Sequence, residues 1–313
     1  MTELAEKIIK GDKFAIARGI SLVENESKES ALLLKLLYKN TGKAYIIGIT
    51  GPPGAGKSTI TNNLTKLLVE KGYKVGIIAV DPTSPFTGGA LLGDRIRMQE
   101  KGLDEKVFIR SMATRGSLGG LSRKAKEVSE ILDASGKDFI IMETVGVGQS
   151  ELDIAQTADT TIVVLVPESG DSVQTMKAGL MEIGDIFVIN KSDREGSEAL
   201  GVALRTMLHL KASRESDREI PVIKTIALQN KGTEELLDFI FRHKEYLESR
   251  GKLREKRKSH LIKQINEIVS GKLKNNFWTE ENRKKLESNI DKISSREITP
   301  YDFAESLFNK SLT

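Results

Sequence analysis

The sequence predicts an α/β protein whose mostly parallel sheet is flanked by helices, and three observations support this fold class. Short β-rich runs alternate with helical segments between residues 45 and 226. These runs are apolar on both faces, and the segments before and after this region show helical spacing only. Buried strands separated by helices are typical of a parallel sheet covered on both sides. The predicted strands are 45–50, 75–80, 107–110, 138–143, 160–166, 185–190 and 221–226.

Helical segments precede and follow the predicted sheet. Residues 2–38 carry leucine and isoleucine at helical spacing and show no visible chemistry. We therefore expect an N-terminal helical extension at 1–42, an α/β domain at 43–245 and a helical C-terminal arm at 246–313. The arm carries an apolar stripe that either its own α/β domain or a second subunit must cover, and its length favours a dimer. The stripe consists of Leu261, Ile262, Ile265, Ile268, Val269 and Leu273.

Composition is that of an ordinary globular protein, with 39% hydrophobic and 29% charged residues among 313. The apolar runs are too short to span a membrane, and the first twenty residues exclude a signal peptide, so we expect a cytoplasmic protein. The net charge of +4 comes from interspersed charges, which predicts no nucleic-acid partner and makes the basic run 252–258 a solvated helix face rather than a binding patch. The chain lacks cysteine and has three scattered histidines, which disfavours disulfides and transition-metal sites.

A phosphate-binding loop lies in the segment IIGITGPPGAGKST, where a strand, a glycine-rich loop and a helix follow one another. Backbone N–H groups can surround a phosphate only where side chains do not intrude, and the helix start adds a positive dipole end. Lys57 would reach the β- and γ-phosphates, and the Ser58 hydroxyl would bind magnesium. The chain is therefore predicted to be a P-loop NTPase, although this loop alone does not separate ATP from GTP.

The identity of the nucleotide base is predicted from NKSD at 190–193, which follows a buried run. The Asp193 carboxylate can accept two hydrogen bonds from guanine N1–H and its exocyclic amine, which adenine cannot offer. Asn190 and Lys191 would support the ring and the loop. GTP or GDP is therefore the expected ligand. The complete set of predicted nucleotide-binding residues is Gly51, Gly54, Ala55, Gly56, Lys57, Ser58, Thr59, Gly146, Asn190, Lys191, Asp193, Ala227 and Leu228.

Acidic residues follow two predicted strands and are candidate metal ligands. Asp81 ends the second strand and Glu143 ends the fourth, so both would lie at the carboxyl edge of the sheet beside the phosphate loop. Glu143 is expected to hold magnesium together with Ser58, and Gly146 leaves room for the γ-phosphate. Asp94 is a further candidate, and for both Asp81 and Asp94 the alternative is a helix cap.

Three long segments make a family recognisable: VDPTSPFTGGALLGDRIRM at 80–98, FIRSMATRGSLGGLS at 108–122 and ETVGVGQSE at 143–151. Together with the phosphate loop and NKSD, they closely resemble the MeaB/ArgK family of GTPases over nearly the whole chain. The resemblance implies a chaperone of an adenosylcobalamin-dependent acyl-CoA mutase, such as methylmalonyl-CoA mutase, that gates cofactor delivery and protects or reactivates the mutase. It also implies a homodimer formed through the C-terminal arm.

Switch-like segments are expected at 81–98, 144–151 and 167–179. The third of these departs from the family pattern. Glu168 stands where the family usually has a small residue, and Ser172 stands where it usually has an acid. The departure lies in the segment that the resemblance assigns to coupling with the mutase, whereas the phosphate, magnesium and guanine residues are all present.

The predicted reaction is in-line attack of water on the γ-phosphate, with Lys57 and magnesium stabilising the developing charge. Glu143 and Gln149 are the other candidate catalytic residues, Gln149 as a water-positioning group. Four arginines either couple switch order to catalysis or form surface salt bridges. They are Arg95, Arg97, Arg110 and Arg115.

Three other functions remain open from the sequence. A P-loop kinase of a small molecule or transport protein would need an acceptor pocket and a base, and no motif for either is visible. A nickel-insertion GTPase shares the architecture, but the absence of cysteine disfavours it. A scaffold that binds GTP and barely hydrolyses it is the third alternative.

Overall fold

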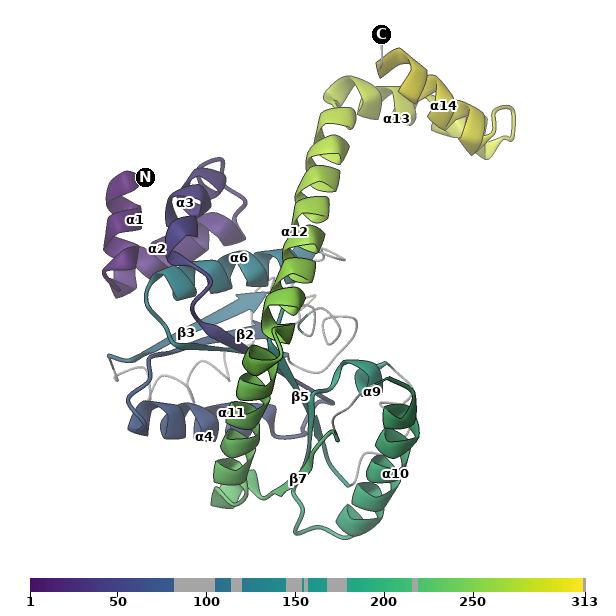
Figure 1. Ribbon diagram of the computed structural model, residues 1–313. Coiled ribbons are helices and arrows are strands. Elements are labelled where there is room, and N and C mark those ends of the chain that lie inside the picture. Colours follow the sequence, from purple (N-terminus) through teal and green to yellow (C-terminus); the bar gives the residue numbers. More distant parts are fainter. Residues whose placement is uncertain are drawn as a thin grey trace. The chain divides into compact units, whose positions relative to one another are not determined.

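The computed structural model describes residues 1–81, 105–113, 120–144, 154, 157–167, 179–215 and 219–311 (Figure 1). The chain divides into two compact units, Met1–Arg257 and Lys258–Thr313. Each unit has its own packing, so the two are described in turn. In the described part of the chain, no helix is both long enough and apolar enough to span a membrane.

The first unit contains a parallel sheet of seven strands in the order β3-β2-β4-β1-β5-β6-β7. Every strand overlaps one of the predicted runs, which confirms the α/β P-loop fold. Strands β4, β2 and β3 lie on one side of β1, and β5, β6 and β7 lie on the other, so the carboxyl end of β1 is a ligand-binding position. The strands are β1 (Tyr45–Thr50), β2 (Val75–Asp81), β3 (Val107–Ala113), β4 (Phe139–Thr144), β5 (Thr160–Leu165), β6 (Ile186–Asn190) and β7 (Val222–Thr225).

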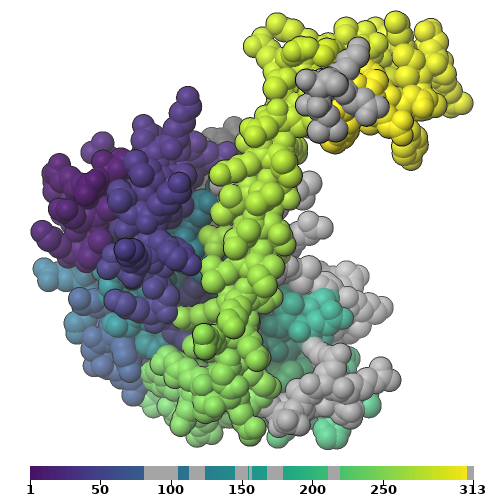
Figure 2. All heavy atoms as spheres, turned by 45° about the horizontal axis from the view of Figure 1, so that its top comes forward, coloured from purple at the N-terminus to yellow at the C-terminus, as the bar shows by residue number. Residues whose placement is uncertain are grey.

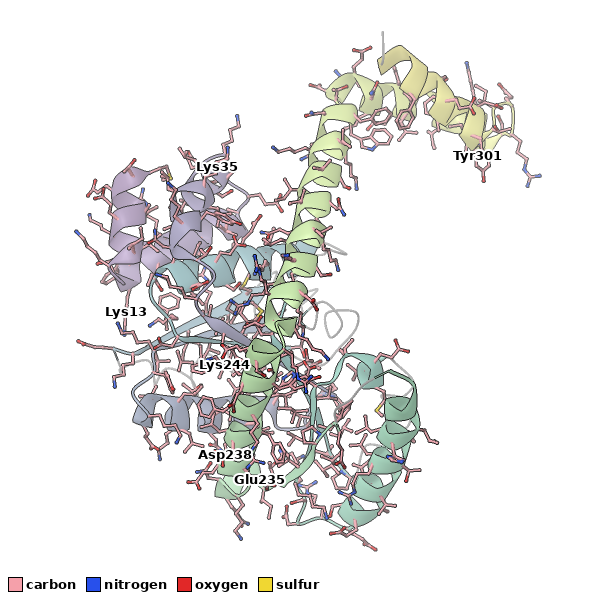
Figure 3. All side chains as sticks on the ribbon, in the orientation of Figure 1. Lys13, Lys35, Glu235, Asp238, Lys244 and Tyr301 are labelled. Atoms are coloured by element: carbon pink, nitrogen blue, oxygen red, sulfur yellow. The ribbon has the colours of Figure 1, made fainter. Side chains whose placement is uncertain are left out.

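Helices cover both faces of this sheet, as Figure 1 shows for α4 and α6. Successive strand residues alternate between the faces: Ile47 packs with α4 (Lys57–Glu70) and α11 (Thr233–Ser249), and Ile46 packs with α6 (Gly120–Ala134). Beyond β5, the second face is covered by α9 (Leu180–Ile183) and α10 (Ser197–Glu215). Helix α11 buries its leucines against the sheet and directs Glu235 and Asp238 to solvent (Figure 3).

The N-terminal extension is helical, as predicted, and packs on α6. Its elements are α1 (Thr2–Ile9), α2 (Lys13–Glu24), α3 (Ser30–Leu37) and the short 3-10 helix η1 (Tyr38–Asn40). Ile16 and Leu33 are buried with Ile131 of α6 in one apolar cluster. Arg110 of β3 forms an ion pair with Glu24 of α2, so this arginine has the salt-bridging role that was one of its two predicted alternatives.

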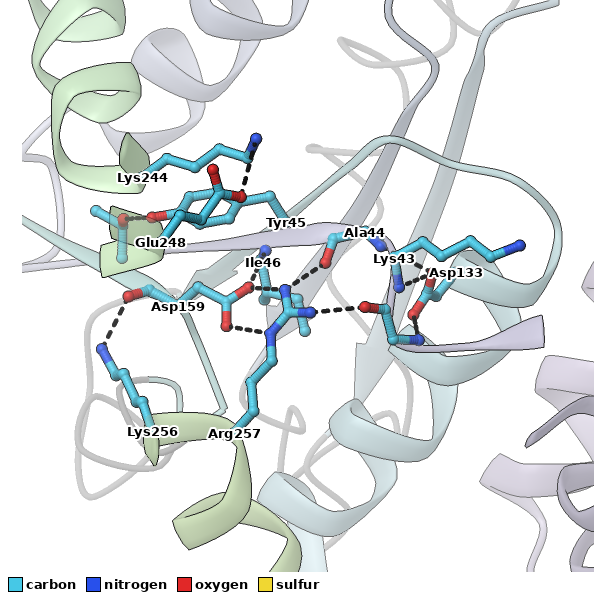
Figure 4. Close-up of polar contacts among 12 residues, drawn as sticks. Lys43, Ala44, Tyr45, Ile46, Asp133, Asp159, Lys244, Glu248, Lys256 and Arg257 are labelled. Atoms are coloured by element: carbon cyan, nitrogen blue, oxygen red, sulfur yellow. Dashed lines mark hydrogen bonds and ion pairs between the residues drawn. The ribbon is translucent and has the colours of Figure 1, made fainter. Parts of the chain in front are cut away.

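The first residues of α12 (Lys252–Phe277) are attached to the amino edge of the sheet (Figure 4). Arg257 forms a two-pronged ion pair with the buried Asp159, with N–O distances of 3.0 and 2.7 Å. It also donates to the carbonyl oxygens of Gly42 and Ala44. Burial, the largest single influence, lowers the pKa of the Arg257 guanidinium, but the hydrogen bonds with Asp159 and the charges of Asp159, Asp133 and Tyr45 together outweigh it, so the net pKa is raised.

The second unit consists of the rest of α12 with α13 (Glu280–Ser294) and α14 (Pro300–Ser311), and Figure 2 shows the last two helices, in yellow, gathered at the end of α12. The rings of Phe277 and Phe308 stack with centroids 4.5 Å apart. The predicted apolar stripe of α12 is largely exposed: Ile262 is 61% exposed and Leu273 is 65% exposed. The predicted domain boundaries at 42/43 and 245/246 stay predictions.

Candidate functional site

The phosphate loop connects β1 to α4 at the carboxyl edge of the sheet. Gly51 has φ +136°, and a Cβ at this position would collide with the carbonyl of Val164 in β5. Gly56 has φ +89° and caps α4, and a Cβ there would collide with the side-chain amide of Asn190. Glycine is thus required both by backbone conformation and by close approach. The first intrahelical bond of α4 runs from Ile60 N to Gly56 O, so the earlier N–H groups have no carbonyl partner within the helix and can face an anion.

Lys57 opens helix α4 and lies against the loop. Its side chain is 5% exposed, and its ammonium donates to the carbonyl oxygens of Gly51 and Pro52 at 2.7 and 2.9 Å. A buried cation at a helix N-terminus is suited to bind phosphate oxygens, because they offer a charged acceptor in place of the neutral carbonyls. The geometry therefore agrees with the position that the motif predicts for this lysine.

The Ser58 hydroxyl donates to a carboxylate oxygen of Glu143, which brings two predicted magnesium ligands together. Glu143 lies in β4 beside Ile49 of β1, and this pairing places it next to the loop that follows β1. Glu143 is 5% exposed. Both side chains present hard oxygen donors, which magnesium prefers. Among the described residues there is no group of three or more His, Cys, Asp and Glu that could enclose a metal. Magnesium needs no such cage when phosphates and water complete its shell, so this donor set fits the ion.

Asn190 at the end of β6 joins the two halves of the site. Its amide nitrogen donates to the carbonyl oxygen of Ala55 in the phosphate loop at 2.8 Å. Its amide oxygen accepts from Ala227 N and from the Thr225 hydroxyl, each at 3.0 Å. The side chain is 3% exposed, so the bonds are shielded from water. Asn190 therefore holds the phosphate loop and the segment after β7 at a fixed separation.

The remaining predicted base-side residues lie in the turns that follow β6 and β7. Lys191 adopts φ +55°, and the next turn leaves Asp193 exposed, where a ligand can reach its carboxylate. After β7, the 3-10 helix η2 (Ala227–Gln229) begins with the buried Ala227 and continues with Leu228, which is 89% exposed. Parallel pairing of Asn190 with Thr225 places both turns at the same edge of the sheet.

Two hydrogen-bonding residues at this site have no counterpart in the predicted set. Thr225 binds the Asn190 amide oxygen, and Asn63 of α4 donates from its side-chain amide to the carbonyl oxygen of Ala227 at 2.7 Å. Neither belongs to a recognisable motif. The one signal for Thr225 in the sequence is its position at the end of a strand next to β6, and Asn63 has no such signal.

Several predicted residues lie outside the described part of the chain: Asp94, Gly146 and Gln149. The side chain of Asp81 is also outside it, although its backbone ends β2 next to Ala113 of β3. Most of the three predicted switch segments falls in the same gaps. The described residues thus bring together a cation, a hydroxyl–carboxylate pair and the turn predicted to contact guanine around one loop. This arrangement can bind a nucleoside triphosphate and present its γ-phosphate at a helix N-terminus.

Comparison with known proteins agrees with this geometry. A model of the family described as methylmalonyl Co-A mutase-associated GTPase MeaB matches residues 16–282. A putative GTPase of Pyrococcus abyssi is 51% identical over 310 residues, covering 98% of this chain and 96% of that protein. GTPase ArgK of Escherichia coli is 34% identical over 288 residues, covering 90% of this chain and 87% of that protein.

A mouse relative and a solved structure extend the comparison. The Mus musculus protein named methylmalonic aciduria type A homolog, mitochondrial, is 34% identical over 269 residues, covering 80% of this chain and 65% of that protein. The crystal structure of a LAO/AO transport system kinase is similar with a TM-score of 0.74 at 27% identity, covering 99% of this chain and 97% of that one. On the extent of the family match and the identity to named GTPases, the chain belongs to the MeaB family of GTPases and is an enzyme that hydrolyses GTP.

Proposed function

We propose that this GTPase is a magnesium-dependent chaperone of an adenosylcobalamin-dependent acyl-CoA mutase of the methylmalonyl-CoA mutase type. In this role it gates delivery of the cofactor and protects or reactivates the mutase. The observation that carries the proposal is the match to a family described by its association with methylmalonyl-CoA mutase, over 16–282. The name of the mouse relative, which refers to methylmalonic aciduria, points the same way.

In the proposed complex, the nucleotide lies across the carboxyl edge of the sheet. The phosphates bind at the loop of Gly51, Gly54, Ala55 and Gly56 and at the start of α4, with Thr59 in its first turn. The Asp193 carboxylate selects guanine by accepting from its N1–H and exocyclic amine. The exposed Leu228 side chain covers one face of the ring.

Hydrolysis is proposed to depend on charge placed around the γ-phosphate. Lys57 exchanges its loop carbonyl partners for β- and γ-phosphate oxygens, and this interaction strengthens as charge develops. Ser58 and Glu143 would hold magnesium, with Asp81 or Asp94 as further ligands. When bound, the ion supplies neutralisation of phosphate charge. Gln149 is the proposed water-positioning residue, together with Gly146 close to the γ-phosphate.

We also propose a homodimer formed through the C-terminal arm. The support is the apolar stripe of α12, in which Ile262, Ile265 and Leu273 are each more than half exposed at 61%, 58% and 65%. An apolar helix face of this length is costly in water and is suited to pack against a second copy.

The test of the chaperone proposal is GTP hydrolysis by the purified protein, alone and with an adenosylcobalamin-dependent acyl-CoA mutase from the same genome. Strong stimulation by the mutase, together with altered cofactor loading of the mutase, is the expected result. Absence of both effects, with tight GTP binding retained, would exclude this client. Asp193→Asn is the specificity control, because an amide at this position should shift preference from GTP toward xanthosine triphosphate.

A phosphotransferase is the second candidate, favoured by the description of the similar solved structure as a transport system kinase. Water as the sole acceptor, seen as stoichiometric release of inorganic phosphate, would exclude it. Nickel insertion lacks support from the described residues, which contain no cluster of three metal-binding side chains. A scaffold that binds GTP without hydrolysing it conflicts with the GTPase assignment. Single-turnover kinetics would identify such a scaffold by the absence of GTP hydrolysis.

A further inference from the structure

The bond between Asn63 and Ala227 connects the phosphate-binding helix to the turn on the base side of the site. Asn63 lies in α4, six residues after Lys57, and donates to the Ala227 carbonyl oxygen at 2.7 Å. A rise of about 1.5 Å per residue places Asn63 about 9 Å along the helix from the phosphate-binding lysine. A single rigid element therefore carries the phosphate-binding residues at its start and a hydrogen bond to the base-side turn further along.

Side-chain amides hold Ala227 on both sides of its backbone. Its N–H donates to the Asn190 amide oxygen at 3.0 Å, and its carbonyl oxygen accepts from Asn63. The turn that it begins is closed at its base by backbone bonds between Ile226 and Lys231, at 3.1 and 3.3 Å. These bonds fix where the turn starts and ends. The two amides fix its distance from β6 and from α4.

We propose that Asn63 is a positioning residue for guanine selection, acting through Ala227 and not through direct contact with the nucleotide. Asn190 links the turn to the phosphate loop and to β6, and it holds Ala227 on the N–H side only. The second attachment, from α4, holds the carbonyl side of Ala227, and it ties the Ala227–Leu228 segment to the helix that begins with Lys57. The protein must contact the base and the phosphates of one nucleotide at the same time. The separation between the Ala227–Leu228 segment and Lys57 therefore decides how well a guanine nucleotide fits. The inference rests on the proposed guanine site.

A structural alternative is that Asn63 only stabilises the fold. Asparagine is unfavourable inside a helix relative to alanine, so Asn63→Ala should gain helix propensity while losing one hydrogen bond. The neighbouring Asn62 provides a matched control. It has the same residue type on the same helix and is likewise partly exposed, and its side chain makes no hydrogen bond to any residue that the structure describes. Asn62→Ala changes helix propensity equally and leaves the Ala227 bond intact.

The experiment measures dissociation constants of GDP, ADP and inorganic tripolyphosphate by calorimetry for the full chain and its variants. Loss of one neutral hydrogen bond predicts a rise of about five-fold in the dissociation constant of GDP for Asn63→Ala. Tripolyphosphate lacks a base, so its affinity should not change. Asn63→Asp keeps the side-chain shape but offers no N–H donor, and should weaken GDP binding at least as much. Asn62→Ala should bind all three ligands as the unmodified protein does.

Steady-state hydrolysis gives a second readout that a purely structural role would not produce. Asn63→Ala should raise KM for GTP and leave kcat at saturation within about two-fold, because Asn63 acts on binding of the base and not on the reacting phosphate. If Asn63→Ala binds GDP as tightly as the unmodified protein, the inference is wrong. Equal weakening of GDP and tripolyphosphate also overturns it, since α4 itself would then be disturbed. Failure of the unmodified protein to prefer GDP over ADP would instead refute the guanine site.

Discussion

Arg257 of α12 closes a buried ion pair with Asp159, the residue that immediately precedes β5. The carboxylate is 1% exposed and also accepts from Ile46 N at 2.9 Å, while Arg257 reaches the carbonyl oxygens of Gly42 and Ala44 (Figure 4). These contacts gather the amino ends of β1 and β5 around one side chain. They lie at the edge of the sheet opposite to the nucleotide site.

Arg257→Ala should destabilise the first unit strongly. Removing one partner leaves the Asp159 carboxylate buried without its cation, a change that typically costs about 3–5 kcal/mol. Denaturant unfolding of the variant should show this loss, with GDP affinity at the remote nucleotide site unchanged under native conditions. Arg254→Ala, at an exposed position in the same helix, should change stability by less than about 0.5 kcal/mol. Equal stability of the two variants would contradict the importance of the ion pair.

The fold was more predictable from the sequence than the ion pair of Arg257. All seven strands were predictable, because runs apolar on both faces have few alternatives to a covered parallel sheet. The phosphate loop was also predictable, since its chemistry is local in sequence. Within the basic run 252–258, however, expected as a solvated face, Lys256 and Arg257 bind Asp185 and Asp159. Nothing local distinguishes these two cations from their neighbours, because their partners are far away in the sequence.

The same limit applies at the nucleotide site. The motif predicted Ser58 and Asn190, and the register of β1 with β4 placed Glu143 beside the loop. Asn63 could not be selected over Asn62 from the sequence, since the choice depends on which helix face meets the turn after β7. Asp94 and Gln149 stay predictions, because they lie outside the described residues.

Gly56→Ala should weaken nucleotide binding for a local steric reason. The glycine has φ +89°, and an added Cβ would displace the Asn190 amide that supports the loop. Gly72 is the matched control: it has φ +95° and nothing within 4 Å of an added Cβ. Both variants bear a left-handed backbone cost of about 1–2 kcal/mol. Only Gly56→Ala should lose GDP affinity, by at least about 10-fold, as calorimetry can measure; two equally affected variants would indicate backbone strain alone.

Glu143→Gln and Ser58→Ala should weaken the binding of magnesium to the complex with GTP. Glu143→Gln removes the carboxylate charge, and Ser58→Ala removes the hydroxyl oxygen that is hydrogen-bonded to that carboxylate. We expect at least about a 10-fold higher magnesium requirement for hydrolysis, and little change in GDP binding in the presence of a chelator. The double variant should raise the magnesium requirement by no more than the two single effects combined, because the two side chains form one site. Unchanged magnesium titrations would place the metal elsewhere.

Tyr45 should make the stability of the protein fall in alkaline solution. Its phenol is buried, donates to or accepts from Thr160 at 2.5 Å, and Thr160 in turn meets His243 Nδ1 at 2.8 Å. Burial raises the pKa of Tyr45. The hydrogen bond with Thr160 and the charge of Arg257 act against this rise, and the nearby Asp159 and Asp185 carboxylates add to it.

The sign of the effect follows from which state keeps the proton. Below pH of about 10, the phenol is neutral in both folded and unfolded chains, so its contribution to stability is complete. At higher pH the unfolded chain loses the proton first, and the free energy of unfolding falls by up to about 1.4 kcal/mol for each pH unit. Tyr45→Phe has no proton to lose, so its unfolding free energy should fall less steeply between pH 9 and 11 than that of the unmodified protein. Tyr38→Phe, at a position that is 57% exposed, should retain the full slope, and equal slopes for all three proteins would show that Tyr45 does not govern alkaline unfolding.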